Sequence, residues 1–410
     1  MAFNIALSGL NAAQTDLDVK GNNIANASTT GFKRSRAEFG DLYSSGLLNL
    51  GSTETGEGVQ VQDTRQLFQQ GNITSTNNGL DMAIDGEGFF VLQGADGEQF
   101  SRAGQFGVDK NGVITNNQGA ELQGFQPQNG EVGNGQGELK SLTVNQEKLE
   151  PKATANVDVN VNLDSRETIP PENPFDATKS KTYNHSTTST IYDSLGNPHE
   201  MTQYFVKQNN NNNEWKSHIK IDGEKVAEGA LTFNENGALD TGEIQVNGWV
   251  PKDSAGNPNG AKNPSDFVID YADTTQFGSG FAVDELQQDG FATGRLTGLD
   301  VTGEGVIQAR FSNGRSEALG QVALANFQDK EGLAPIGDTA WAQTFESGEP
   351  AINPPNTGSV GSIRSSSVEE SNVDLSEQLV GLITAQRNFQ ANSKTIETSD
   401  QITQTIINLR

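Results

Sequence analysis

An apolar repeat of seven residues lies at each end of this 410-residue chain, and this arrangement restricts the folds open to it. The first repeat consists of Phe3, Leu10, Leu17 and Ile24, with Ala6 and Ala13 between them. Such spacing places the apolar side chains along one stripe of a helix. The N-terminus is therefore predicted to form an amphipathic helix with a single narrow apolar seam.

The second repeat lies close to the C-terminus. It consists of Leu375, Leu382, Phe389 and Ile396, with Leu379 between the first two. Asp374 and Glu377 have the spacing of a capping box, which predicts a helix start near Leu375. Gly and Asn residues weaken both helices, so each is expected to be disordered until it gains a partner. We predict that the two helices pair as a coiled-coil-like core and that the residues of the two repeats drive polymerisation.

The interior of the chain follows a period of two instead. Residues 155–163 and 215–221 alternate apolar and polar side chains, as half-buried antiparallel strands do. Asn-Gly and Asp-Gly pairs, such as Asn111-Gly112 and Asp222-Gly223, favour tight hairpins. The predicted fold class is α+β, with mainly antiparallel β modules between two terminal helices.

Pairing of the two ends requires discontinuous domains, each built from an outgoing and a returning segment. Four domains are expected. They are a helical core (1–30 and 372–410), a connecting segment (31–71 and 358–371), an inner β domain (72–145 and 291–357) and an outer β domain (146–290).

Charge and composition exclude several classes of function. The net charge of the chain is −26. Residues 1–40 contain four basic and three acidic side chains, and residues 375–410 contain three of each. The middle of the chain, residues 41–374, therefore carries −27. So acidic a chain is a poor ligand for nucleic acid or anionic membranes. It has no Cys, which excludes disulfides and thiolate chemistry, and its three His lack metal-ligand spacing.

Three short motifs invite a chemical interpretation, and each has a better structural one. Asp85-Gly-Glu-Gly88 precedes an apolar strand pattern, whereas a phosphate loop precedes a helix. Asp109-Lys-Asn-Gly112 is expected to be a hairpin turn and not a calcium loop. The basic island Phe32–Arg36 is expected to make a local structural contact or to form ion pairs. We predict no catalytic, metal or cofactor site, no membrane insertion and no Sec signal peptide.

Several stretches resemble the bacterial flagellar rod and hook subunits. The N-terminal signature consists of Leu7-Ser-Gly-Leu-Asn-Ala-Ala13, Gly21-Asn-Asn-Ile-Ala-Asn26 and Thr30-Gly-Phe-Lys33. Met82–Phe90 and Phe100–Phe106 resemble the inner β module of that family, and Ile191–Asn197 resembles the outer domain of its hook members. Val322–Phe327, Ser371–Ser376 and Ala385–Ala391 resemble the C-terminal return. The resemblance covers nearly the whole chain.

This resemblance implies a structural subunit that polymerises with itself into the hook, a curved, flexible tube that acts as a universal joint between rod and filament. It implies terminal helices around a central channel and β domains outside. The implied partners are the flagellar rod, the hook cap, the hook–filament junction proteins and the flagellar type III export apparatus, with the hook lying outside the cell after export. Phe39 and Tyr43 resemble the element that such subunits present to the export gate.

Three alternatives remain open at this point. A distal rod subunit shares both ends, but the large segment 146–290 counts against it. A secreted polymeric β adhesin would lack paired heptads, and an enzyme would need a convergent polar pocket. Tube formation by the purified chain at raised salt discriminates among all of these.

Overall fold

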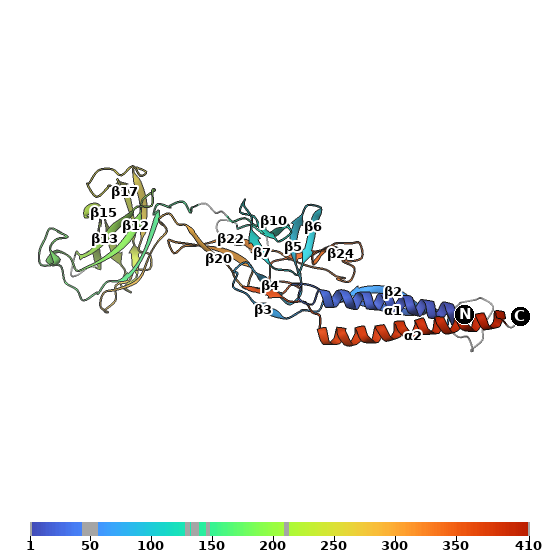
Figure 1. Ribbon diagram of the computed structural model, residues 1–410. Helices are drawn as coiled ribbons and strands as arrows, with labels where there is room; N and C mark the ends of the chain where they lie inside the picture. Colours follow the sequence, from blue (N-terminus) through green and yellow to red (C-terminus); the bar gives the residue numbers. More distant parts are fainter. Residues whose placement is uncertain are drawn as a thin grey trace. The chain divides into compact units, whose positions relative to one another are not determined.

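The computed structural model describes residues 2–42, 56–127, 132, 139–144, 148–208 and 213–408. The chain forms two compact units. Unit 1 comprises Met1–Gln146, Thr297–Arg310 and Ser316–Arg410, and unit 2 comprises Glu147–Leu296 and Phe311–Arg315. In the order of the chain, mainly antiparallel strands lie between two terminal helices, which confirms the predicted fold class (Figure 1). The four domain ranges drawn from the sequence stay a prediction.

Two long helices and a hairpin form one part of unit 1. Helix α1 spans Ala2–Ala25 and helix α2 spans Leu375–Asn408. Strands β1 (Ser35–Leu42) and β2 (Gly58–Gln66) pair antiparallel. In Figure 1 the helices lie side by side with both chain ends at the same end of the pair, so they run antiparallel, and β2 runs along α1.

The rest of unit 1 is a β body. Its largest sheet has 13 strands in the order β20-β21-β22-β9-β5-β6-β25-β24, with β7, β8, β10, β23 and β26 branching from this path. The strands are β5 (Phe89–Gly94), β6 (Gly97–Ser101), β7 (Phe106–Val108), β8 (Ile114–Asn116), β9 (Glu121–Phe125), β10 (Leu139–Ser141), β20 (Leu296–Val301), β21 (Val306–Phe311), β22 (Ser316–Val322), β23 (Leu324–Asn326), β24 (Ala334–Gly337), β25 (Ala340–Ala342) and β26 (Ala351–Asn353). Two small pairs join the outgoing and returning segments: β4 (Met82–Asp85) with β27 (Ser362–Ser365), and β3 (Ile73–Ser75) with β28 (Ser367–Glu369).

Aromatic side chains fill the core of this β body. The rings of Phe100 and Phe327 lie 4.7 Å apart in an edge-to-face arrangement, and those of Phe89 and Trp341 lie 5.6 Å apart. Such contacts stabilise a core beyond the area they bury. Strand β5 contributes Phe89 and Val91 to this core. It begins at Phe89, directly after the turn that ends at Gly88. The structural interpretation of the Asp85–Gly88 motif is therefore correct, because a strand and not a helix follows it.

Unit 2 consists of two sheets around one core. One sheet has the order β17-β18-β11-β19 and the other β12-β13-β14-β15-β16. Their strands are β11 (Asn156–Asn162), β12 (His185–Tyr192), β13 (Pro198–Lys207), β14 (Glu214–Ile221), β15 (Glu224–Phe233), β16 (Leu239–Thr241), β17 (Glu243–Trp249), β18 (Ser265–Asp270) and β19 (Ala282–Gln288), and a short 3-10 helix spans Ser180–Thr182. Residues of both sheets, among them Val159 and Trp215, form a single buried cluster.

The predicted alternation appears in these strands. Val157, Val159 and Val161 of β11 are buried, while their neighbours Asn156 and Asp158 are exposed. One pairing differs from expectation, because β11 runs parallel to β18 over three residues and antiparallel only to β19. An alternating pattern reports the buried face of a strand and not the direction of its neighbour, so sequence could not distinguish the two.

The predicted hairpin at Asp222-Gly223 is confirmed. The two residues connect β14 to β15, and both have positive φ, at 50° and 83°. A two-residue turn with both central positions in this region matches the twist of the strands that it joins.

Candidate polymerisation interface

Helices α1 and α2 contact each other through small and polar residues. A side-chain Cβ built on Gly9 would lie 2.8 Å from the Asn392 Oδ1 atom, and one built on Gly381 would lie 2.4 Å from the Lys20 Cε atom. At the end of the pair away from the chain termini, the Asn23 side-chain amide donates to Gln378 Oε1 at 3.1 Å. We call these positions the contact line. Its glycines leave room for the Asn392 and Lys20 side chains, so a side chain at Gly9 or Gly381 would have to displace them.

The contact line buries little apolar surface. Among the helix residues whose burial is described, the buried apolar ones are four alanines, Ala6, Ala12, Ala13 and Ala385. An alanine removes far less apolar area from water than a leucine, so helix pairing within one chain gains little from the hydrophobic effect. Sequence reasoning placed the leucines at this contact and missed the contact line. The three- and four-residue spacing of Ala6, Gly9 and Ala13 was the signal that could have found it.

The residues predicted to drive polymerisation remain largely accessible. Phe3, Leu375 and Leu379 are exposed, at 47%, 48% and 50%. The other six predicted core residues are partly buried. They are Leu10, Leu17, Ile24, Leu382, Phe389 and Ile396. The structure thus brings the two repeats into one helix pair but leaves their large side chains without a full set of contacts. Their part in polymerisation stays a prediction.

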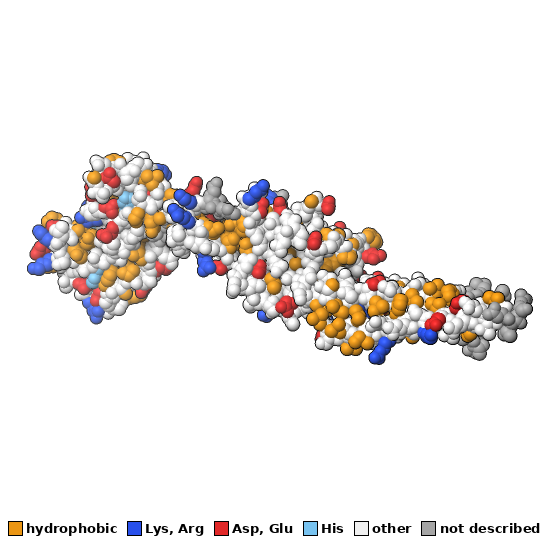
Figure 2. Space-filling model, viewed as in Figure 1, with side chains coloured by type: hydrophobic (Ala, Val, Ile, Leu, Met, Phe, Trp, Pro, Cys, Tyr) orange, Lys and Arg blue, Asp and Glu red, His pale blue; other side chains and the backbone are white. Residues whose placement is uncertain are grey.

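Helical geometry places both repeats on the same side of the pair. Successive residues are turned by about 100°, so Leu10 and Leu17 lie about a quarter turn from the contact line on α1. Leu375 and Leu382 lie about a quarter turn from it on α2, in the same rotational sense when each helix is viewed from its own N-terminus. Because the helices are antiparallel, equal rotations bring the two stripes to one side. We call this side, formed by the nine predicted residues, the apolar face; Figure 2 shows hydrophobic side chains gathered along the helices.

The β1–β2 hairpin covers the opposite side of α1. The backbone N–H of Val59 donates to Ser8 Oγ at 3.2 Å, and the Asn23 side-chain amide donates to the Ser35 carbonyl at 2.8 Å. Ser8 and Asn23 lie on the side of α1 away from Leu10 and Leu17. The helix pair therefore has one side packed against its own chain and another, the apolar face, that its own hairpin does not cover.

A buried ion triad fastens both ends of the chain to the β body. The Glu369 carboxylate accepts from Lys33 Nζ at 2.6 Å and from Arg102 Nη1 at 3.1 Å. It also accepts from the backbone N–H of Gly71 at 2.8 Å. The Lys33 and Glu369 side chains are 0% exposed. Burial lowers the pKa of the Lys33 amine, and the neighbouring Glu369 carboxylate opposes this shift.

The basic island forms ion pairs, as predicted, and two of them reach residues far along the chain. Besides Lys33, Arg34 Nη1 lies 2.8 Å from Glu377 Oε2, and Arg36 Nη2 lies 2.7 Å from Glu38 Oε1. Asp374 also acts as predicted, since its Oδ1 accepts from the backbone N–H groups of Ser376 and Glu377 at the start of α2. The Glu377 side chain pairs with Arg34 instead of returning to the helix start, so the capping box is only half formed.

Phe39 of the predicted export-gate element lies on β1, opposite Val61 of β2, and its ring is 41% exposed. Tyr43, its predicted partner, lies outside the described residues. An exposed aromatic on a hairpin is accessible to another protein, and the role of this element stays a prediction.

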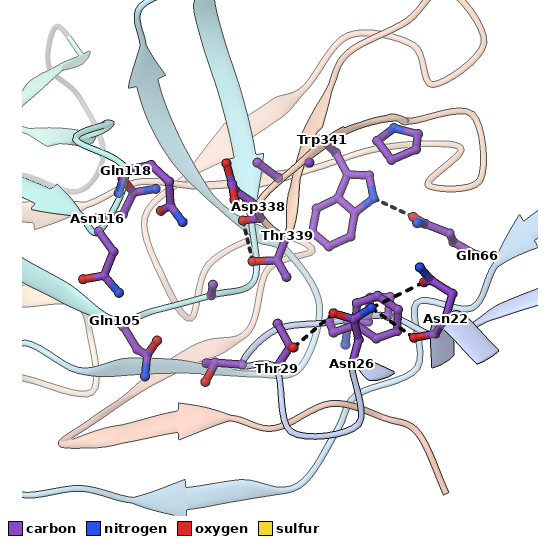
Figure 3. A pocket seen from close by; sticks show the side chains of 18 residues that line it. Asn22, Asn26, Thr29, Gln66, Gln105, Asn116, Gln118, Asp338, Thr339 and Trp341 are labelled. Carbon is purple, nitrogen blue, oxygen red and sulfur yellow. Dashed lines mark hydrogen bonds between the residues drawn. The ribbon is translucent and has the colours of Figure 1, made fainter. Parts of the chain in front are cut away.

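A cavity of about 560 Å³ lies in unit 1, where the end of α1 approaches the β24–β25 hairpin (Figure 3). Its lining is rich in neutral amides, and the Trp341 indole N–H donates to Gln66 Oε1 at 2.6 Å. The charged lining residues are Lys33, which Glu369 already pairs, and Asp338. Within the described ranges, no three His, Asp or Glu side chains are placed to hold a metal ion, and no helix combines the length and hydropathy of a membrane span.

Four family models match successive parts of the chain. Residues 3–33 match the flagella basal body rod protein family, and residues 83–164 match the flagellar hook protein FlgE/F/G D1 domain. Residues 162–291 match the flagellar basal body protein FlaE D2 domain, and residues 364–409 match the flagellar basal body rod FlgEFG protein C-terminal family.

Full-length relatives share this arrangement. The flagellar hook protein FlgE of Escherichia coli (strain K12) is 38% identical over 415 residues, which cover 100% of both chains. The flagellar hook protein FlgE of Borreliella burgdorferi is 33% identical over 436 residues, or 98% of each chain. The crystal structure of Helicobacter pylori flagellar hook protein FlgE2 has the same fold, with a TM-score of 0.54 and 14% identity over 71% of this chain and 99% of that one. This chain therefore belongs to the flagellar hook protein family and is a structural subunit of the bacterial flagellar hook, not a member of an enzyme family.

Proposed function

We propose that copies of this chain assemble the hook by burying the apolar face of the helix pair in contacts with neighbouring copies. The observation that carries this proposal is the exposure of large apolar side chains such as Phe3, Leu375 and Leu379 in the single chain. Full burial of a Leu or Phe side chain contributes about 1.5–3 kcal/mol relative to exposure. Because every copy repeats the contact, the gain is large for the polymer.

The charge distribution favours an assembly in which the two helices lie inside and the acidic part of the chain lies outside. Residues 1–40 and 375–410 carry net charges of +1 and 0, whereas residues 41–374 carry −27. Neutral segments pack closely without repulsion, and acidic ones are best placed where water and salt screen them. The helices accordingly form the inner wall of a tube, and the β units form its outer shells.

The proposal includes finer roles, which rest on this arrangement and on the resemblance to hook subunits. A copy that contacts the next through two different surfaces continues into an open helical polymer, which suits a tube. Residues 146–290 form the outermost layer, and the tube bends as a universal joint while it transmits torque from rod to filament. The rod, the hook cap, the hook–filament junction proteins and the type III export apparatus are its partners, and Phe39 and Tyr43 form the export-gate element.

Electron microscopy of the purified chain tests the proposal. We expect raised salt to convert monomers into hollow tubes, because it screens the repulsion between acidic copies. Chains that stay monomeric at every salt concentration, or that form solid fibres, would contradict it.

Deletion of residues 146–290 is expected to leave tube formation intact but to change tube curvature. Both helices and the β body of unit 1 lie outside this segment, whereas the core of unit 2 lies within it. The measurement is the length and curvature of tubes in micrographs. Deletion of residues 375–410 is the matched control and should abolish tubes. If the 146–290 deletion also gave monomers only, the outer position of this segment would be wrong.

Tube curvature is also expected to change with ionic strength. Screening acts over about 8 Å at physiological salt and over longer distances in dilute buffer, so repulsion between acidic outer layers grows as salt falls. Curvature is measured across a salt series, with sucrose at matched osmolality as the control. A curvature that stays constant from low to high salt would count against loosely packed acidic contacts.

A further inference from the structure

The turn between β25 and β26 presents an aromatic side chain that has no contacts in its own chain. Phe345 is 101% exposed. The turn beneath it is braced, since the Thr344 backbone N–H donates to Ser347 Oγ at 3.0 Å and the Ser347 hydroxyl donates to the Thr344 carbonyl at 2.9 Å. The Thr344 hydroxyl donates to the Gly332 carbonyl at 2.5 Å, and Ser347 is fully buried. An aromatic on a rigid support loses little conformational freedom when it binds.

The same turn carries an unused negative charge. Glu346 is exposed, and its carboxylate forms no ion pair with any described residue. The segment Thr344–Ser347, which we call the Phe345 turn, therefore offers an apolar ring beside a carboxylate. An apolar surface next to a cation would complement it.

Helix α2 has such a surface on the side turned away from α1. Val380 and Ile383 are 66% and 49% exposed. Arg387 follows four residues after Ile383, which places all three side chains on one stripe, roughly opposite the contact line. Over the described chain, Arg387 makes no ion pair, although acidic residues outnumber basic ones 53 to 27. We call Val380, Ile383 and Arg387 the outer stripe; it is separate from the apolar face.

We propose that the Phe345 turn of one copy docks on the outer stripe of α2 in a neighbouring copy. The Phe345 ring packs between Val380 and Ile383, and the Glu346 carboxylate pairs with the Arg387 guanidinium. The inference rests on the proposed function, because the occupant is a second copy of this chain. Two different surfaces meet in this contact, so it is heterologous and extends an open polymer. It fixes the β body of one copy over the helix of the next, and charge complementarity sets the register.

A charge-swap experiment tests the pairing. Glu346→Arg and Arg387→Glu are each expected to raise the monomer concentration needed for tube formation at least about 10-fold, because each places like charges opposite one another. The double variant restores the opposite pair and should return this concentration to within about threefold of the unmodified chain. The contact would be overturned if neither single charge reversal changed the monomer concentration needed for tube formation. It would also be overturned if the single reversals raised this concentration and the double variant did not restore it.

Truncation of the ring provides a second measure. Phe345→Ala should raise the critical concentration for tube formation at least about 10-fold, because it removes an aromatic anchor. Phe345→Leu should raise it by a smaller factor, because leucine keeps part of the apolar contact. The monomer should unfold at an unchanged temperature, since Phe345 contacts nothing in its own chain. An unchanged critical concentration for Phe345→Ala would overturn the anchor.

Cross-linking places the contact between copies. The chain has no Cys, so chains with Glu346→Cys and differently tagged chains with Arg387→Cys give an unambiguous mixed product with a short cross-linker. Tubes grown from a mixture of both Cys variants with an excess of unmodified chain should yield the mixed cross-linked product. Tubes that form but yield no such product would overturn the contact between the Phe345 turn and the outer stripe and leave the proposed function standing. If unmodified chains form no tubes at all, the proposed function falls together with this contact.

Discussion

Leu382→Asp is expected to give a soluble monomer that forms no tubes. Leu382 lies on the apolar face between Leu375 and Phe389, and it is only partly buried in the single chain. The variant monomer therefore tolerates the new carboxylate in contact with water. In the polymer that carboxylate would be buried without a partner, which costs several kcal/mol in every copy. Sedimentation and electron microscopy at raised salt measure the outcome.

Leu382→Met is the matched control for this variant. Methionine keeps the volume and the apolar character, and such exchanges usually cost less than about 1.5 kcal/mol. Tubes of Leu382→Met should therefore look normal. Normal tubes from Leu382→Asp would show that the apolar face stays in contact with water in the hook.

Glu369→Leu is expected to lower the stability of unit 1 by about 3–5 kcal/mol. Removal of one partner from a buried ion pair leaves the other charges uncompensated, and here two cations, Lys33 and Arg102, would remain buried. Glu377→Gln is the control, since the Glu377 side chain is 63% exposed, and its pairing with Arg34 should contribute at most about 1 kcal/mol.

Fluorine NMR of fluorotryptophan-labelled chain during denaturation measures this effect unit by unit. Trp341 lies in unit 1 and reports the Glu369 variant, whereas Trp215 and Trp249 lie in unit 2 and should unfold at the same denaturant concentration as before. A Trp341 transition that does not move would show that the triad contributes no net stability. A shift of all three signals would mean that the variant acts on more than unit 1.

The repeats at the chain ends predicted both helices, because a spacing of seven residues is a local property. The presence of one such repeat at each end predicted that the helices pair. The repeats did not predict how the helices touch. Large side chains such as Leu10 dominate a hydrophobic pattern, while the contact itself runs through Gly9 and Gly381, which such a pattern ignores. The sequence indicated that these residues drive polymerisation but not which side of the helix pair stays open, since that depends on where the β1–β2 hairpin lies.

The triad was beyond prediction for a different reason. Lys33 and Glu369 are 336 residues apart, and Arg102 comes from the end of β6. The basic island indicated that ion pairs would form, but charged residues are common on any surface. Only the fold identifies which pair is buried, and burial is what makes removal of Glu369 costly, whereas loss of the exposed Arg34 contact costs little.

Amide hydrogen exchange tests most directly the central claim that neighbouring copies stabilise the helix pair. Within one chain the pair is held by alanines, glycines and a few polar contacts, so its free energy of opening should be close to zero. Peptides from Ala2–Ala25 and Leu375–Asn408 should exchange rapidly in the monomer and slowly in tubes. The peptide of β14, Glu214–Ile221, should be protected in both and serves as the reference. Strong protection of both helices in the monomer, equal to that in tubes, would contradict the account.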